Sequence, residues 1–184
     1  LSGGKGHDAL AGGDGYDKLS GNTGNDSLDG GRGDDTLYGN AGADTLSGND
    51  NNDSLYGSDG NDSLSGGAGG DLLQGNKGKD VMSGGAGADE FVWLAGENFV
   101  AATGVAYVDR ITDFTSGDQL NFDMLVKNGS NTDVSDYVRF VDGAAGTTVL
   151  VASSLTSAFH ETVLPEGVHG LTVDQAQTDG WVII

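Results

Sequence analysis

The stretch Gly30-Gly31-Arg32-Gly33-Asp34-Asp35-Thr36-Leu37-Tyr38 decides the fold, because its nine-residue pattern runs ten times through residues 3–92 without insertion or deletion. The first position of the pattern is always glycine, the sixth is always aspartate and the eighth is always a large apolar residue. The ten aspartates are Asp8, Asp17, Asp26, Asp35, Asp44, Asp53, Asp62, Asp71, Asp80 and Asp89. Three fixed columns across ten copies indicate a repeat architecture, in which each unit packs on its neighbours.

The repeat predicts a coil built from turns and short strands. We expect a six-residue turn followed by a three-residue strand such as Thr36-Leu37-Tyr38, whose middle residue faces the core because side chains alternate along a strand. Glycine suits the turn, where the backbone takes a positive φ or passes close to an ion. Two units make one coil, so ten units make about five coils spaced ~4.8 Å apart. For residues 1–92 this predicts an all-β fold, a right-handed parallel β-roll.

The same stacking places alternate aspartates in two columns, one on each edge of the roll. Like charges about 5 Å apart repel by roughly 3 kcal/mol at an effective dielectric constant of about 20. One buried leucine per repeat contributes only about 2 kcal/mol, so we expect the roll to require a counter-ion. Calcium accepts carboxylate and carbonyl oxygens in flexible geometry, whereas magnesium is smaller and dehydrates reluctantly. Four gaps in each five-member column predict about eight Ca²⁺ ions.

All ten repeats resemble those of the repeats-in-toxin (RTX) family, in which the ion lies between neighbouring turns. The resemblance implies that the ten aspartates bind calcium together with the backbone carbonyl oxygens of the fourth-position glycines. These glycines are Gly6, Gly15, Gly24, Gly33, Gly42, Gly60, Gly69, Gly78 and Gly87.

Several copies depart from the pattern. Asn51 replaces the fourth-position glycine of repeat six, so we expect a strained or weak site there. The first repeat, with His7, and the last, with Phe91, are edge copies whose outer sites are expected to be incomplete. Other turns are expected to be less well buttressed because their fifth position lacks the Asn or Asp of most copies. They are those of Ala43, Gly70, Lys79 and Ala88.

Composition narrows the class of protein. A net charge of -20 on 184 residues disfavours nucleic acid and anionic lipid as partners. No cysteine is present, and no apolar run approaches the ~20 residues of a membrane-spanning helix. The chain starts within a repeat and shows no N-terminal signal peptide, so we expect a piece of a longer protein. A flexible Gly/Asp linker is the alternative, but a linker needs no apolar residue at every ninth position.

Residues 93–184 have no such period and are expected to form a β-rich, sandwich-like cap over the end of the roll. Repeat arrays need a cap, because an open end would expose Met82 and Phe91. A hairpin is expected around residues 142–146. We expect strands at 91–94, 107–114, 119–122, 137–141, 147–152, 161–164 and 181–184, and short helical turns at 124–127 and 173–177.

Two segments of this half resemble the region that follows the roll in large secreted RTX adhesins. Residues 109–122 resemble the segment after the roll, and residues 167–175 with the apolar end resemble the type I secretion target region. Asp109, Asp113 and Asp118 form one further candidate calcium site, or alternatively cap strands and turns through hydrogen bonds. Residues 181–184 are a last core strand, an export signal, or both.

We do not expect an enzyme. His160-Glu161 lacks the second histidine of a zinc H-E-x-x-H site, no G-x-S-x-G motif occurs, and thiol catalysis needs a cysteine. The carboxylates are needed by the regular array, so a glycosidase pair is a poor interpretation.

The resulting hypothesis is a monomeric, calcium-dependent folding module at the C-terminus of a large secreted or cell-surface bacterial RTX protein, first of all an adhesin. Its partners are calcium and a type I secretion channel, and it is exported without an N-terminal signal peptide. The alternative is a non-catalytic, glycan-binding RTX module of a secreted polysaccharide-modifying enzyme. An ice-binding solenoid would need regular files of Thr and Asn, and Thr23 and Asn25 have no such succession in neighbouring repeats.

Overall fold

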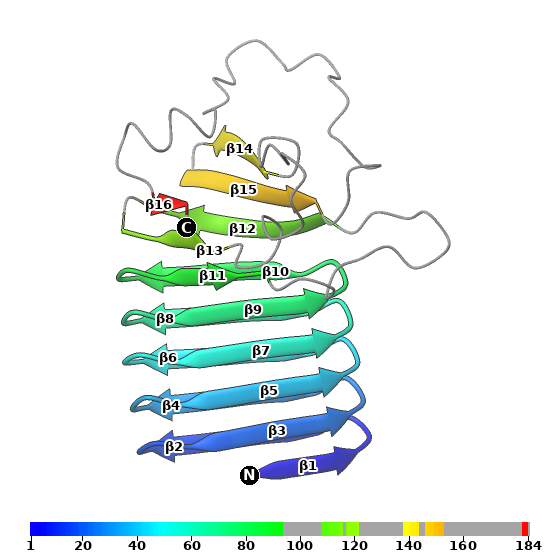
Figure 1. Ribbon diagram of the computed structural model, residues 1–184. Coiled ribbons are helices and arrows are strands. Elements are labelled where there is room, and N and C mark those ends of the chain that lie inside the picture. Colours follow the sequence, from blue (N-terminus) through cyan, green and yellow to red (C-terminus); the bar gives the residue numbers. More distant parts are fainter. Residues whose placement is uncertain (94–107, 116, 122–137, 144–145, 153–181, 184) are drawn as a thin grey trace, which may run out of the picture.

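The computed structural model describes residues 1–93, 108–115, 117–121, 138–143, 146–152 and 182–183, whose regular secondary structure is β-strand throughout. The repeats form a column of stacked coils with the N-terminus at one end (Figure 1). Their strands are β1 (Ser2–Lys5), β2 (Ala9–Asp14), β3 (Lys18–Thr23), β4 (Ser27–Arg32), β5 (Thr36–Ala41), β6 (Thr45–Asp50), β7 (Ser54–Asp59), β8 (Ser63–Ala68), β9 (Leu72–Lys77), β10 (Val81–Ala86) and β11 (Glu90–Val92).

These strands divide into two parallel sheets that face each other across the roll. One sheet runs β1-β3-β5-β7-β9-β11 and the other runs β10-β8-β6-β4-β2. Neighbouring strands pair in parallel with a register of 18 residues, as in Leu28 with Leu46 and Leu37 with Leu55. Because 18 residues are two repeats, each coil consists of two repeats, and the predicted parallel β-roll of about five coils is confirmed.

The strands are longer than the sequence analysis predicted. Each strand from β2 to β10 has six residues rather than three and extends through the third position of the next repeat. Between β4 and β6, for example, Gly31 pairs with Asn49 and Arg32 pairs with Asp50. Only the fourth to sixth positions are left for the turn. The prediction was wrong because it assigned every glycine to the turn, whereas the first two glycine columns belong to the ladders.

The core is one file of eighth-position side chains on each sheet. All of them from Leu19 to Phe91 are at most 2% exposed, while Leu10 in the first coil is only partly buried. The neighbouring seventh and ninth positions are mostly exposed or half-buried, as expected from alternation along a strand. Each coil therefore buries only two large side chains, which leaves the roll with a thin apolar centre.

The expected cap is present at the C-terminal end of the roll (Figure 1). Strand β12 (Val108–Phe114) pairs in parallel with β10, and β13 (Gln119–Asn121) pairs in parallel with β11. Both strands lie beyond the boundary expected at residue 92 and nevertheless continue the two sheets of the roll. Met82 pairs with Ile111 and Phe91 with Leu120, and Met82 and Phe91 are fully buried. The ring of Phe114 lies 6.1 Å from that of Phe91.

Three further strands complete the described residues. The predicted hairpin is confirmed as β14 (Val138–Gly143) and β15 (Gly146–Ala152), which pair antiparallel, with β15 also antiparallel to β12. The short β16 (Val182–Ile183) pairs in parallel with β13, as expected for a last strand. The strand expected at 161–164, the helical turns at 124–127 and 173–177, and the segment 167–175 lie outside the described residues. No helix long and apolar enough to span a membrane occurs among the residues described.

Candidate calcium sites

The sixth-position aspartates form two hydrogen-bonded columns, one along each edge of the roll. Each aspartate directly precedes a strand, and its Oδ1 accepts a hydrogen bond from the backbone N–H of the aspartate one coil below. In one column Asp26 N–H donates to Asp44 Oδ1 over 2.7 Å, and in the other Asp35 N–H donates to Asp53 Oδ1 over 2.8 Å. The columns that the sequence predicted are thus built by the carboxylates themselves, each of which fixes the turn beneath it.

The second oxygen of these carboxylates has no such partner. In the described part of the chain, Oδ2 is buried and receives no hydrogen bond in nine of the ten aspartates. They are Asp8, Asp26, Asp35, Asp44, Asp53, Asp62, Asp71, Asp80 and Asp89. A buried carboxylate oxygen without a donor is strongly unfavourable, and nine of them in two files call for a cation.

Burial changes the acidity of the inner members of both columns. It is the largest cause that raises the pKa of Asp53 to about 7, that of Asp62 to about 6 and that of Asp80 to about 8. The neighbouring aspartates of each column raise the pKa further, while the hydrogen bond from the backbone opposes the change. Without a cation, the folded roll therefore competes with protonation of its own carboxylates near neutral pH.

The first-position glycine of each repeat makes room for the carboxylate. A Cβ built on Gly21 would collide with Oδ2 of Asp26, five residues later, and one built on Gly48 would collide with Oδ2 of Asp53. These glycines do not have a positive φ, so their requirement is space rather than backbone conformation. Any larger residue would displace the oxygen that has no donor.

The fourth-position glycines bring backbone carbonyl oxygens to the same edges. Gly24 has a φ of 126°, and a Cβ there would collide with the carbonyl oxygen of Gly6, one coil below. The carbonyl oxygens of Gly24 and Gly42 accept none of the turn hydrogen bonds in the described residues. A file of carbonyl oxygens free to bind a cation thus accompanies each file of carboxylates.

Asn51 takes the fourth position in this file with a Cβ present. Its φ is 82°, close to the backbone conformation of the glycines. The hydrogen bond from Gly33 N–H to Asp50 O just beneath it is 3.2 Å long. The equivalent bonds elsewhere in the roll are 2.7–2.9 Å. The expected strain at this repeat therefore appears as a local widening between coils.

The fifth-position side chains form a second set of hydrogen bonds between turns. Asn25 Oδ1 accepts a bond from Ala43 N–H over 3.0 Å, and Asn52 Oδ1 accepts one from Gly70 N–H over 2.7 Å. The turns of Ala43, Gly70 and Lys79 are therefore buttressed, because the acceptor comes from the coil below. The prediction placed the weakness one coil too early: Asn61 and Ala88, which follow Ala43 and Gly70 by 18 residues, are the turns without an acceptor beneath them.

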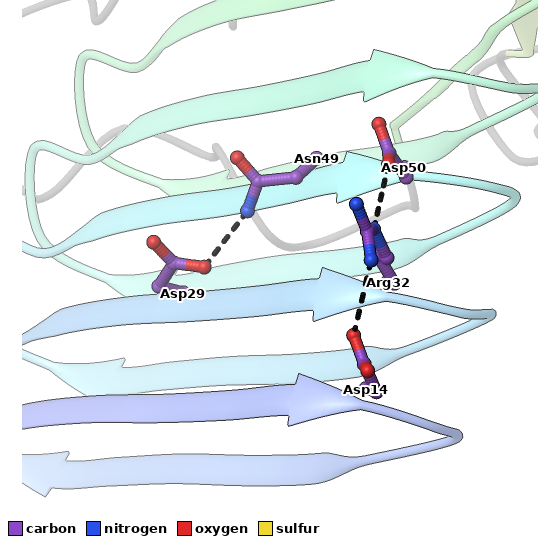
Figure 2. Close-up of polar contacts among 5 residues, drawn as sticks. All are labelled: Asp14, Asp29, Arg32, Asn49 and Asp50. Atoms are coloured by element: carbon purple, nitrogen blue, oxygen red, sulfur yellow. Dashed lines mark hydrogen bonds and ion pairs between the residues drawn. The ribbon is translucent and has the colours of Figure 1, made fainter.

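Exposed aspartates on the sheet faces have other partners. Arg32 lies between Asp14 and Asp50 of the adjacent coils, with N···O distances of 3.8 and 3.6 Å (Figure 2). In the same view Asn49 Nδ2 donates to Asp29 over 2.8 Å. Exposed pairs of this kind contribute little to stability. They separate the surface carboxylates, which have cationic or amide partners, from the buried ones at the edges.

The donor set at the edges suits calcium. No group of three acidic, histidine or cysteine side chains gathers among the described residues, so a site there combines at most two carboxylates with carbonyl oxygens. Such an all-oxygen, mainly neutral set of ligands is what Ca²⁺ accepts in flexible geometry. The buried, unbonded Oδ2 atoms show where the positive charge is needed.

Asp109, Asp113 and Asp118 do not converge on one point. Asp109 and Asp118 occupy the sixth positions of a last coil, where their Oδ1 atoms accept from Asp80 N–H and Asp89 N–H. Asp113 accepts from Gly84 N–H, Gly85 N–H and Ser83 Oγ–H. This arrangement matches the hydrogen-bonding alternative, while calcium binding by these three residues stays a prediction. Their nine-residue separation, with an apolar residue two positions after Asp109 and after Asp118, was the signal that the sequence analysis missed.

A pair of glycine substitutions tests the carbonyl file. Gly15 and Gly33 both have a positive φ, but a Cβ on Gly33 would strike the carbonyl oxygen of Gly15, whereas a Cβ on Gly15 would meet no atom within 4 Å. Gly33→Ala should therefore raise the calcium concentration at the folding midpoint more than Gly15→Ala does, as measured by far-UV circular dichroism. Equal shifts in the two variants would contradict a role for the carbonyl oxygen.

A pH series without metal tests the buried carboxylates. Their pKa values are raised above the usual 3.8, to between about 6 and about 8 where resolved. The metal-free roll thus binds more protons than the unfolded chain, and its stability falls as the pH rises through this window. In buffer stripped of metal, the strand signal should be larger at pH 5 than at pH 8. A strand signal that grows with pH would contradict this electrostatic explanation.

Comparisons with known proteins agree with the geometry. The family model of the RTX calcium-binding nonapeptide repeat, four copies long, matches residues 2–37, 20–55, 29–64, 38–73, 56–91 and 65–99. A comparison with curated proteins found no match to this chain. The family matches together span residues 2–99, more than half of the 184 residues. The chain therefore belongs to the family of RTX calcium-binding nonapeptide repeat proteins.

Proposed function

We propose that this chain is a non-catalytic module that folds when it binds Ca²⁺ outside the cell and that takes part in export of a secreted bacterial protein through a type I channel. One observation carries the proposal: the nine buried Oδ2 atoms that receive no hydrogen bond from the described residues. The folded roll needs positive charge at these atoms, so folding and cation binding are one process.

The energetics favour a switch rather than a permanently folded domain. Each coil buries two large apolar side chains, which is little against the conformational entropy of 18 residues. A bound ligand adds about 2.7 kcal/mol of stability per site at a hundredfold excess over its Kd. Several sites together outweigh the entropy cost where calcium is abundant. Where calcium is scarce, the unfolded acidic chain is in a form that a narrow channel can pass.

For the whole protein we propose a large cell-surface adhesin. The support is the resemblance of residues 109–122 and 167–175 to the region after the roll in such proteins. The end strand β16 pairs with β13 in the folded state, so an export signal at residues 181–184 would be read before folding. One short segment would thus serve export first and the cap afterwards.

The glycan-binding alternative receives no support from the most aromatic part of the roll surface. Tyr38 and Tyr56 stack with ring centroids 5.0 Å apart and an interplanar angle of 10°. Lys18 Nζ lies 5.0 Å from the centroid of the Tyr38 ring. The ring faces on which a sugar could stack are thus turned towards each other and towards lysine, along the roll axis.

Export from a bacterium that carries a type I system tests this proposal. The full chain should accumulate in the medium, and more should accumulate with millimolar calcium outside the cells than with a calcium chelator. Deletion of residues 181–184 should abolish export.

A variant with Asp→Asn at the five positions of one column, Asp8, Asp26, Asp44, Asp62 and Asp80, serves as the control. It should still be exported, because its end segment is intact, but its export should lose the response to calcium. Normal secretion of the deletion variant would remove the signal role, and calcium-independent export of the full chain would contradict the folding switch.

A further inference from the structure

The last coil of the roll treats its carboxylates differently from all the others. Asp109 Oδ1 accepts Asp80 N–H over 2.9 Å and Asp118 Oδ1 accepts Asp89 N–H over 3.1 Å, which continues the bonds within each column. Their second oxygens, however, have protein donors. The indole Nε1–H of Trp93 donates to Asp109 Oδ2 over 2.9 Å, and Thr115 N–H donates to Asp118 Oδ2 over 2.7 Å.

The comparison is between equivalent positions. Asp109 and Asp118 precede β12 and β13 as the other aspartates precede their strands, and Ile111 and Leu120 follow as the buried eighth-position residues. Asp109 and Asp118 are 2% and 3% exposed, as deeply buried as the column members below them. The difference between the end coil and the regular coils is therefore the partner of Oδ2 rather than its environment.

Asp113 closes the end coil in a second way. It stands at the first position, where every regular repeat has glycine. Its two oxygens accept Gly84 N–H over 3.0 Å and Gly85 N–H over 2.9 Å. All six carboxylate oxygens of Asp109, Asp113 and Asp118 thus accept hydrogen bonds from the protein.

We propose that the indole N–H of Trp93 and the backbone N–H of Thr115 take the place of a cation at the C-terminal end of the two columns. The intervals Asp80–Asp109 and Asp89–Asp118 then hold no calcium. Each column has four calcium sites below this end, so the chain binds about eight ions and not ten. The inference rests on the calcium binding proposed above and adds to it a metal-free end coil, whose limit is set by two hydrogen-bond donors.

The physical reason is that a cation and an N–H donor compete for the same lone pairs. In the regular coils Oδ2 is free to bind metal, whereas in the end coil a calcium ion would have to displace a buried donor and leave it without an acceptor. The end coil can therefore remain closed while the regular coils gain or lose ions. Trp93 is in this sense a residue that sets the number of ions rather than a ligand.

Counting bound ions tests the inference. Equilibrium dialysis with elemental analysis should give about eight calcium ions for the full chain. Trp93→Phe removes the donor and frees Asp109 Oδ2, so it should bind one ion more. Phe114→Leu, which alters cap packing against Phe91 but no donor to either carboxylate, should keep the original number. Ten ions in the unchanged chain, or no additional ion in Trp93→Phe, would overturn the inference.

A second pair of variants distinguishes an end residue from a ligand. Asp109→Asn should leave the ion count unchanged, whereas Asp62→Asn, at the equivalent position within the same column, should lose at least one ion. Equal losses in the two variants would overturn the inference. If Asp109→Asn does not reach the full strand signal in excess calcium, the count for Trp93→Phe decides alone. A complete absence of bound calcium in the unchanged chain would instead contradict the proposed function.

Discussion

Each edge of the roll is governed by a carboxylate that shares its two oxygens between different partners. One oxygen accepts the backbone N–H of the turn below, which fixes the spacing of the coils. The other is buried and has no donor among the described residues. Both the order of the roll and its need for positive charge follow from this one side chain. Replacing it by an apolar residue would remove the charge problem and the hydrogen bond together.

The glycine pattern follows from the same carboxylate. The first-position glycine leaves room for Oδ2, and the fourth-position glycine lets a carbonyl oxygen approach the coil above. Because two of every nine residues are given over to these contacts, little volume remains for a core. The roll is thin and depends on its end coil, where Phe91 packs against Phe114 and the last aspartates find protein donors. The cap thus completes both the apolar file and the polar columns.

Much of this could be predicted from the sequence because the repeat fixes three columns at once. The two aspartate columns, the file from Leu19 to Phe91 and the hairpin of β14 and β15 were all predicted from spacing. The strand length was wrong, since glycine was taken as a sign of turn when Gly21 and Gly48 are in fact small to admit a carboxylate. The last coil was missed because residues 94–107 interrupt the period. Which oxygen of each aspartate meets an N–H depends on turn geometry, which no residue spacing reveals.

The most direct test of this account is far-UV circular dichroism of the chain during titration with calcium at pH 8, with magnesium titrated in parallel. The account predicts little strand signal in excess chelator, a cooperative gain of strand signal as calcium is added, and a far weaker response to magnesium. A full strand signal that persists in excess chelator at this pH would contradict it, because the buried carboxylates would then be stable without a cation.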